Sequence, residues 1–506
     1  MSPLALMPSR RFVASALLTC VLVAALAPLE VVSAQSRRGS KATKAAAAGA
    51  AGGWTQVETK GGRLIHVAID GSDTNPGTEK RPLASLEAAY VALNDGKADS
   101  VLLRRGDRWT LSKTLMWTKS GPAAEGAGWM RLGAYGDENK PRPVLDFVGG
   151  ASMHVSPGYR SDRVLSNLAF TDVHFVASER LDKPRGATSG YAVMLIAVEW
   201  KGSGMPFRHV LFENMKLQGF GGGISTERNV EDLRIRRSIF TDLFNPGGSG
   251  MHCSGVLTEA AGLLLEDNVF FRIQHPDTDG VDGISVFAHS AYIGAGARDV
   301  VCRGNFIVKA TEGLMVRSGG VYERNVSAEN SLACMFGQAY GVTPTADGVP
   351  VQVRENLFLD NQEGFSLGNA RGGDFTQNLL LRGPEGDRDQ DLTLIGRNPQ
   401  RDGVNIGVHG VAFAENHLSG KIRFAQPQRD EQHYSDVSFS RNKDDVSPLS
   451  KDVGDFLKSV GLKGATMTDY AALLVERDRA NFGDNLQTTA MINFYRKAVG
   501  LPALKP

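Results

Sequence analysis

Residues 289–305 read HSAYIGAGARDVVCRGN, and residues 309–325 read KATEGLMVRSGGVYERN. Both stretches are seventeen residues long, end in Asn and carry an apolar or aromatic side chain (or Cys) three residues before it. The frame occurs three more times, at His252 to Asn268, Tyr340 to Asn356 and Gln362 to Asn378. Apolar positions alternate around each Asn, as in short strands with one buried face. One such unit cannot bury its own face, so the copies are predicted to stack into a solenoid.

Weaker copies of the frame extend the predicted stack in both directions, around Asn167, Asn214, Phe240 and Asn416. The spacing between consecutive Asn residues of the five clear copies varies from 20 to 37 residues, so some rungs are bare and others carry loops. A β-propeller is the structural alternative, but its blades need four strands and a more constant period of about 40 residues or more. The repeated Asn suits a turn with left-handed backbone angles or a stacked amide ladder.

The N-terminus has the features of an export signal. Arg10 and Arg11 precede an apolar stretch from Phe12 to Leu26, and Val32-Ser33-Ala34 matches a cleavage site of small residues. The two arginines fit an ordinary basic leader or a twin-arginine signal, and both routes stay open. We expect residues 1–34 to be removed from an exported protein, either periplasmic, cell-surface or extracellular, with no membrane span after them.

Composition divides the rest of the chain into three parts. Residues 35–60 are rich in Ala, Gly and Lys and are predicted to be a disordered linker. The solenoid is expected to occupy residues 61–445, with a short helix after the N-cap residue Ser85 that covers its open end. Apolar residues follow helical spacing in residues 446–506, so this extension is expected to fold back as helices on the solenoid.

Charge and cysteine content limit the classes of partner. The formal net charge is +1, and removal of the leader brings it to about 0, so nothing favours a nucleic acid or an anionic membrane. Three cysteines remain after cleavage, Cys253, Cys302 and Cys334. An odd number leaves at least one unpaired, and Cys302 falls on an inward position. We therefore expect the cysteines to be small buried core residues.

The stretches 70–78 (DGSDTNPGT) and 82–89 (PLASLEAA) resemble the entry of secreted members of the right-handed parallel β-helix, or pectin-lyase-like, superfamily. The resemblance covers about residues 64–445 and implies an all-β, right-handed parallel β-helix. That superfamily holds lyases, hydrolases, epimerases, esterases and phage adhesins. Residues 314–319 (LMVRSG) are similar to the catalytic-arginine rung of the alginate lyase and chondroitinase B group, which implies a catalytic Arg317. Where that group places a lysine base about one rung upstream, this chain has His289.

Alignment of the five frames by their Asn places one residue of each in a common column, at the sixteenth position before it: His252, His289, Lys309, Tyr340 and Gln362. Equal positions of neighbouring rungs would lie about 4.8 Å apart. Four of these five side chains can transfer protons. The column is therefore a candidate site for acid–base chemistry.

Strand alternation predicts which of these side chains face outward. If Ala288 points into the coil, His289 points out. By the same count Leu314 and Val316 point in, which directs Arg317 outward. His289 and Arg317 are therefore expected to share an outer face.

An outward base beside an outward Arg suits β-elimination on a uronic-acid polysaccharide. This reaction needs a cation on the uronate carboxylate, a base for the proton on the adjacent carbon, and an acid for the leaving oxygen. Arg317 suits the first role because a guanidinium binds carboxylate bidentately. His289 suits the second, and Tyr292 or Lys309 the third. Further substrate contacts are expected from His252, Tyr340 and Glu312.

Other functions remain open at this stage. The carboxylates of Asp277, Asp279 and Asp282 stand among glycines and could bind Ca²⁺, which prefers six to eight oxygens, although such clusters also form ordinary turns. The first hypothesis is an exported lyase with an acidic polysaccharide as partner. The alternatives are a glycoside hydrolase, a uronate epimerase, and a non-catalytic exopolysaccharide-binding or envelope scaffold protein.

Overall fold

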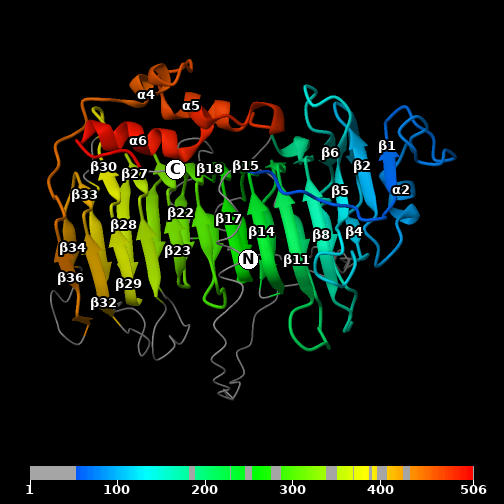
Figure 1. Ribbon diagram of the computed structural model, residues 1–506, viewed down its shortest axis with the longest axis horizontal. Coiled ribbons are helices and arrows are strands. Elements are labelled where there is room, and N and C mark those ends of the chain that lie inside the picture. The colour runs from blue at the N-terminus through cyan, green and yellow to red at the C-terminus, as the bar shows by residue number, and fades with distance from the viewer. Residues whose placement is uncertain are drawn as a thin grey trace, which may run out of the picture. The chain divides into compact units, whose positions relative to one another are not determined.

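A computed structural model describes residues 53–181, 189–227, 229–245, 253–274, 287–337, 350–368, 370–386, 390–395, 407–424 and 433–504, all within the compact unit Ala42–Pro506. Strands dominate these residues and form three sheets in which paired strands all run parallel. From β2 to β34 the chain visits the sheets in turn, so each coil adds one strand to each sheet (Figure 1). The fold is the expected right-handed parallel β-helix.

Sheet 1 comprises β1 (Leu64–Val67), β2 (Ser100–Arg104), β5 (Met130–Tyr135), β8 (Leu165–Thr171), β11 (Phe207–Glu213), β14 (Val230–Arg236), β17 (Ala261–Glu266), β20 (Val301–Arg303), β23 (Gly320–Glu323), β26 (Val351–Arg354), β29 (Ala370–Thr376), β32 (Val408–Ala414), β35 (Tyr434–Ser435) and β36 (Ser438–Ser440). Sheet 2 comprises β3 (Arg108–Leu111), β6 (Val144–Phe147), β9 (His174–Val176), β12 (Lys216–Gln218), β15 (Ile239–Leu243), β18 (Val269–Ile273), β21 (Phe306–Ala310), β24 (Val326–Ala328), β27 (Leu357–Leu359), β30 (Leu379–Leu381) and β33 (His417–Leu418). Sheet 3 comprises β4 (Leu115–Trp117), β7 (Met153–Val155), β10 (Tyr191–Leu195), β13 (Gly222–Glu227), β16 (Cys253–Thr258), β19 (Ala288–Ile293), β22 (Glu312–Val316), β25 (Leu332–Phe336), β28 (Glu363–Gly368), β31 (Leu392–Ile395) and β34 (Ile422–Phe424).

The repeated Asn forms an amide ladder at the corner between sheets 1 and 2. At one step, the backbone N–H and the side-chain amide of Asn305 both donate to Oδ1 of Asn325, at 3.0 and 2.8 Å. The same two bonds join each consecutive pair in the series Asn268, Asn305, Asn325, Asn356, Asn378, Asn416 and Asn442. The left-handed backbone belongs to the preceding residue, as at Arg324 (φ 54°) and Glu355 (φ 58°). The expected amide ladder is therefore confirmed for the Asn, whereas the left-handed conformation belongs to the residue before it.

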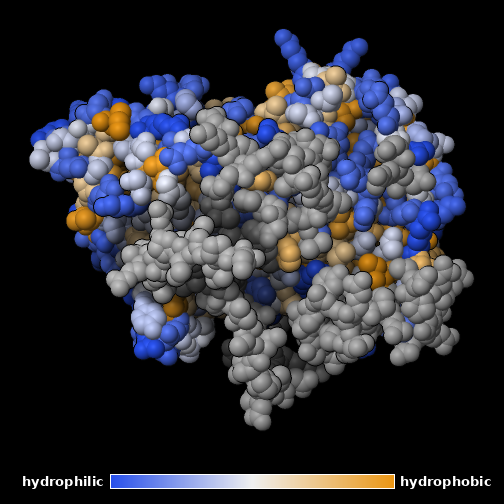
Figure 2. Space-filling view, turned by 180° about the vertical axis from the view of Figure 1, so that it is seen from behind, coloured by the Kyte–Doolittle hydropathy of each residue, from blue (hydrophilic) through white to orange (hydrophobic). Residues whose placement is uncertain are grey.

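The core lies inside the coil and consists of inward-facing columns of apolar side chains. Aromatic rings stack from rung to rung, as between Phe170 and Phe212 and between Phe375 and Phe413. On the visible back face, hydrophobic residues form separate spots among hydrophilic ones (Figure 2). The apolar surface of the repeats is thus largely enclosed, which is the main source of solenoid stability.

Helices cover one end and one side of the coil. Helix α2 (Leu86–Ala92) begins at the expected N-cap Ser85, whose Oγ accepts from Ala88 N, and it buries Leu86 and Ala89 in the core. Helices α4 (Val453–Ser459), α5 (Met467–Leu474) and α6 (Thr488–Ala498) lie along one side of the stack (Figure 1). Short 3₁₀ turns cover Ser178–Arg180, Arg479–Asn481 and Asp484–Leu486.

The C-terminal helices bury the outer face of sheet 2. Phe306 and Val308 on β21 point away from the coil interior and pack with Phe456 and Tyr470 of the helices. The rings of Phe306 and Tyr470 meet edge to face, 5.4 Å apart. This explains why sheet 2 has apolar residues on both faces, a pattern of strands that are buried on both sides.

The structure differs from the linker prediction at residues 53–55. Thr55 N donates to Glu213 Oε2 at 3.0 Å, and the Trp54 ring lies against the guanidinium groups of Arg237 and Arg479. These are specific contacts rather than those of a tether. Trp54 is the one large aromatic residue in the predicted linker, and a ring between two cations gains cation–π energy.

A ladder of alternating charges runs along the outer face of sheet 1. Its members pair in register on consecutive strands: Glu213, Arg236, Glu266, Arg303, Glu323 and Arg354. Arg236 contacts both carboxylates that flank it, at 3.0 and 2.5 Å. Opposite charges on neighbouring strands stabilise this pairing.

Candidate functional site

The candidate site lies on the outer side of sheet 3, where β16, β19 and β22 run side by side. The strand register aligns Ser254, His289 and Glu312 on these three strands. Ala288 and Ala291 of β19 belong to the hydrophobic core, whereas Leu332, which continues the column after His289 and Glu312, lies outside it. The three polar residues therefore form one column across consecutive rungs.

Two side chains hold the imidazole of His289 from opposite sides. Its Nε2 lies 3.1 Å from Glu312 Oε2, and its Nδ1 lies 3.5 Å from Ser254 Oγ. The ring thus lies between a carboxylate, at ion-pair distance, and a hydroxyl. This is the arrangement of a base that is oriented by an acidic neighbour.

Tyr292 and Arg317 complete the cluster. The Tyr292 ring meets the His289 ring edge to face, with centroids 5.1 Å apart. The guanidinium carbon of Arg317 lies 5.9 Å from the centroid of the same ring. Arg317 Nη1 also donates to the Gly337 carbonyl at 3.2 Å and lies 3.8 Å from the Met335 sulfur. A base and a cation thus share one aromatic ring, on the same side of the sheet.

The side chains of these strands point in the predicted directions. A side chain that points away from the coil interior is not necessarily exposed to solvent, however. Leu314 and Val316 lie in the core, and the guanidinium of Arg317 lies against the Tyr292 ring and the Gly337 carbonyl instead. Nevertheless only 1% of the His289 surface and 6% of the Arg317 surface reach solvent. Tyr292 is half-buried and is the most accessible of the three. A ligand would therefore meet Tyr292 first.

The predicted column of proton-transferring residues is wrong for Lys309. This residue lies on β21 in sheet 2 and pairs with Glu329, with Nζ and Oε2 3.4 Å apart. Equal frame positions do not align because Val301 follows Ile293 by eight residues, whereas their register partners Val321 and Val316 are only five residues apart. Counting back from Asn therefore places His289 opposite Lys309, whereas the register places it opposite Glu312.

Five of the predicted site residues lie outside the described part of the chain: His252, Tyr340, Asp277, Asp279 and Asp282. Their roles, and Ca²⁺ binding by the three aspartates, remain predictions. Within the described ranges, no group of three or more His, Cys, Asp or Glu side chains could hold a metal ion.

Sequence reasoning missed two neighbours of the site, Ser254 and Met335. Ser254 is followed by Gly and Val, and nothing in this local sequence marks it as a functional residue. Only the strand register with β19 shows that it lies beside His289. Met335 pairs with Met315 on the next strand and carries the sulfur near Arg317. Neither contact has a signal in the local sequence, because each depends on the length of a connection.

The cysteines behave as expected of core residues. Cys302 and Cys334 are fully enclosed, and Cys253 is buried. Burial raises the pKa of the Cys302 thiol to about 12 and raises that of Cys334 as well. These thiols therefore stay protonated near neutral pH and are poor nucleophiles.

Comparisons with known proteins show similarity in fold. No family model matches the chain, and no curated protein matches its sequence. Among solved structures, a rhamnogalacturonan lyase is 13% identical over 87% of this chain and 100% of that one, with a TM-score of 0.45. The pectate lyase Pel9A is 14% identical over 76% and 79%, with a TM-score of 0.40. The A-module of the Azotobacter vinelandii mannuronan C-5 epimerase AlgE6 is 12% identical over 72% and 91%, with a TM-score of 0.39. In the described residues, no helix combines the length and the apolar character needed to cross a membrane.

Proposed function

We propose that this protein is a polysaccharide lyase that cleaves a uronic-acid-containing chain by β-elimination. The observation that carries the proposal is the shared contact of His289 and Arg317 with the ring of Tyr292. A non-catalytic scaffold needs no such convergence of a base, a cation and a phenol. Glu312, first expected to contact substrate, becomes the residue that orients the base.

Each group has one task in the proposed reaction. Arg317 pairs with the uronate carboxylate and stabilises the negative charge that develops on it. The imidazole of His289 removes the proton from the carbon next to the carboxylate, and the released electron pair forms a double bond as the glycosidic bond breaks. Tyr292 gives its phenolic proton to the departing oxygen. Water then takes the proton from His289 and restores the phenol.

The assay follows from the product. Elimination creates a double bond conjugated to the carboxylate, which absorbs ultraviolet light, whereas hydrolysis does not. We expect this absorbance with at least one polymer among alginate, pectate, glycosaminoglycans and bacterial exopolysaccharides. His289→Ala should lower kcat by about 10²–10⁴-fold. Arg317→Ala should abolish turnover, and Arg317→Lys should restore it only in part because it lacks the bidentate fork.

Arg298→Ala is the matched control, because this exposed Arg follows the same strand β19 and lies outside the cluster. It should leave the rate unchanged. Circular dichroism should show that all four variants remain folded at the assay temperature. Full activity of a folded Arg317→Ala variant would disprove the proposed site.

A glycoside hydrolase is the second candidate, because Glu312 and Glu363 both pair with Leu332 on the strand between them. Two rungs separate such residues by about 10 Å. Inverting hydrolases place their carboxyl groups about 6.5–9.5 Å apart. New reducing ends without ultraviolet absorbance, lost in Glu363→Gln, would favour this function. A changed uronate composition without cleavage would favour an epimerase.

We also propose export, because of the leader-like residues 1–34, which lie outside the described residues. N-terminal sequencing of the mature protein should then begin at Gln35.

A further inference from the structure

Two neighbouring loops of the β-helix carry aromatic side chains at the surface. The loop after β7 holds Tyr159, 63% of whose surface is accessible, and the loop after β10 holds the half-buried Trp200. The loops are joined through their backbones, since Arg160 N donates to the Val198 carbonyl at 3.1 Å. Tyr159 and Trp200 therefore belong to one surface feature, which we call the aromatic platform.

Both rings of the aromatic platform are held in place while part of their surface stays accessible. Trp200 Nε1 donates to the Gly204 carbonyl at 3.2 Å, and its ring lies so close to Gly202 that a Cβ there would be 2.3 Å from Cζ2. The Tyr159 hydroxyl donates to Glu199 Oε1 at 2.8 Å. Because these contacts restrict the rings in advance, a ligand that stacks on them loses less conformational entropy.

The aromatic platform lies along sheet 3 from the candidate site. In the order of the sheet, β10 and β7 are three and four strands before β19, which is about 14–19 Å at the usual strand spacing. From β16 back to β7, each strand adds one residue in register with Tyr292: Leu257, Ser225, Met194 and His154. A polysaccharide laid across the strands from Tyr292 therefore passes both strands that carry the platform.

We infer that the aromatic platform is a distal subsite, which binds the polysaccharide away from the bond that reacts. A pyranose ring has an apolar face of C–H groups that packs against an aromatic ring, while its hydroxyls stay in contact with water. Lys201, next to Trp200, is exposed and can pair with a uronate carboxylate. An acidic polysaccharide as the ligand follows from the proposed function, on which the inference rests.

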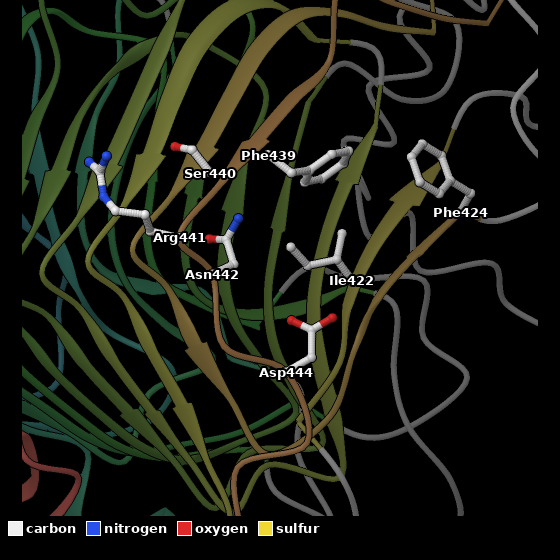
Figure 3. A pocket seen from close by; sticks show the side chains of 7 residues that line it. All are labelled: Ile422, Phe424, Phe439, Ser440, Arg441, Asn442 and Asp444. Atoms are coloured by element: carbon white, nitrogen blue, oxygen red, sulfur yellow. The ribbon is translucent and has the colours of Figure 1, made fainter.

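Another exposed aromatic residue, at the far end of the coil, provides the control. Figure 3 shows a hollow of about 460 Å³ beside the last rung, which Phe439 lines with 44% of its surface accessible. Two polar side chains of this hollow are already engaged within the chain. Arg441 pairs with Glu415 at 2.6 Å, and Asn442 continues the Asn ladder. Phe439 therefore tests whether an exposed ring alone is enough for binding.

Native electrophoresis through gels that contain a polymer tests the inference without requiring turnover. We expect at least one of alginate, pectate and chondroitin sulfate to retard the protein, and neutral dextran to leave its mobility unchanged. Tyr159→Ala and Trp200→Ala should each weaken binding about three- to tenfold, since each removes one stacked ring. Trp200→Phe should retain most of the binding, and Phe439→Ala should retain all of it.

Lys201→Glu tests the same surface in case the loss of a ring disturbs its loop. Because Lys201 is exposed, this variant should stay folded and bind the acidic polymer less tightly, relative to its mobility in a gel without polymer. Circular dichroism checks the folding of every variant.

Ultraviolet absorbance separates this inference from the proposed function. Retardation that is lost in the platform variants, without any elimination product, would keep the subsite and contradict the lyase. Elimination with retardation unchanged in Tyr159→Ala/Trp200→Ala would keep the lyase and overturn the subsite. Loss of binding in Phe439→Ala instead, or no retardation by any of the three acidic polymers, would also overturn the subsite.

Discussion

At the residue scale, Asp172 combines burial with several bonds to its carboxylate. Arg131 Nη2 and Asn214 Nδ2 each donate to it at 2.8 Å, and Arg479 Nε donates to Oδ1 at 2.5 Å. Burial alone would raise the pKa of this carboxyl group, but Arg479 and Arg131 outweigh burial and lower the pKa to about 2. The ionised carboxylate is therefore favoured more in the folded chain than in the unfolded one.

We predict that Asp172→Asn lowers the free energy of unfolding by about 2–3 kcal/mol at pH 7. A lowered folded pKa stabilises the protein above the unfolded value, near 4, and this contribution is lost as the pH falls through about 2. The difference between wild type and variant should therefore shrink between pH 4 and pH 2. Urea unfolding across this range measures it. The exposed Asp162→Asn should show no such trend.

Glu312 tests the proposed chemistry without removing the base. Glu312→Gln keeps the shape of the side chain but removes the charge that faces His289 Nε2. We predict a fall in kcat of about tenfold or more with little change in KM, because only a step that uses the base is affected. Steady-state kinetics on the best polymer measure both constants. An equal loss in KM would assign Glu312 to substrate binding instead.

At the element scale, the Asn ladder turns a corner and joins consecutive rungs. The side chain of Asn325 accepts from Asn305, donates to Asn356 and donates to the Cys302 carbonyl. It thus satisfies buried groups on both neighbouring rungs. A buried donor or acceptor that loses its partner costs about 1–3 kcal/mol.

We predict that Asn325→Ala lowers the free energy of unfolding by about 2–5 kcal/mol, since more than one buried group loses its partner. Asn442→Ala at the half-buried last step is the matched control and should cost less, because no later rung depends on it. Equilibrium unfolding in urea compares the two. Equal losses would mean that the ladder carries little of the stability of the inner rungs.

The same elements show what the sequence could predict. The seventeen-residue frame predicted the position of the Asn ladder and the inward direction of the Leu314 and Val316 side chains. Both could be predicted because every rung repeats the same corner and the same alternation of inward and outward side chains. The alternating charges of sheet 1 were also readable, two residues before successive Asn residues, as at Glu266 and Arg303. The sequence did not reveal that Glu312 is the partner of His289. Connections of unequal length shift the alignment of the frames on sheet 3.

At the scale of the whole molecule, the segment that begins the described residues and the segment around Phe482 meet on the middle rungs. Trp54 contacts the guanidinium groups of Arg237 and Arg479, and its ring meets Phe482 edge to face at 5.6 Å. Arg477 also lies against Phe482. Composition could not predict this, because the segment before residue 60 has linker-like content and its partner is more than 400 residues away. The long-range cluster depends on the coil that both segments pack against.

Because the two segments share one aromatic and cationic cluster, their contributions to stability should be coupled. We predict that Trp54→Ala and Phe482→Ala each lower the free energy of unfolding by about 1–3 kcal/mol. Residues in direct contact typically show interaction energies of about 0.5–3 kcal/mol in a double-mutant cycle. The double variant should therefore lose less than the sum of the two single losses, since either change alone already opens the cluster.

Trp200 provides the control for this cycle, because it is half-buried on a distant loop and its Nε1 donates to the Gly204 carbonyl. Trp200→Ala combined with Phe482→Ala should give additive losses, within about 0.5 kcal/mol. Limited proteolysis adds a second measurement: Trp54→Ala should speed cleavage within residues 477–482 as well as near residue 54. Additive energies for Trp54 and Phe482, with unchanged cleavage of the C-terminal segment, would mean that the two segments dock independently on the β-helix.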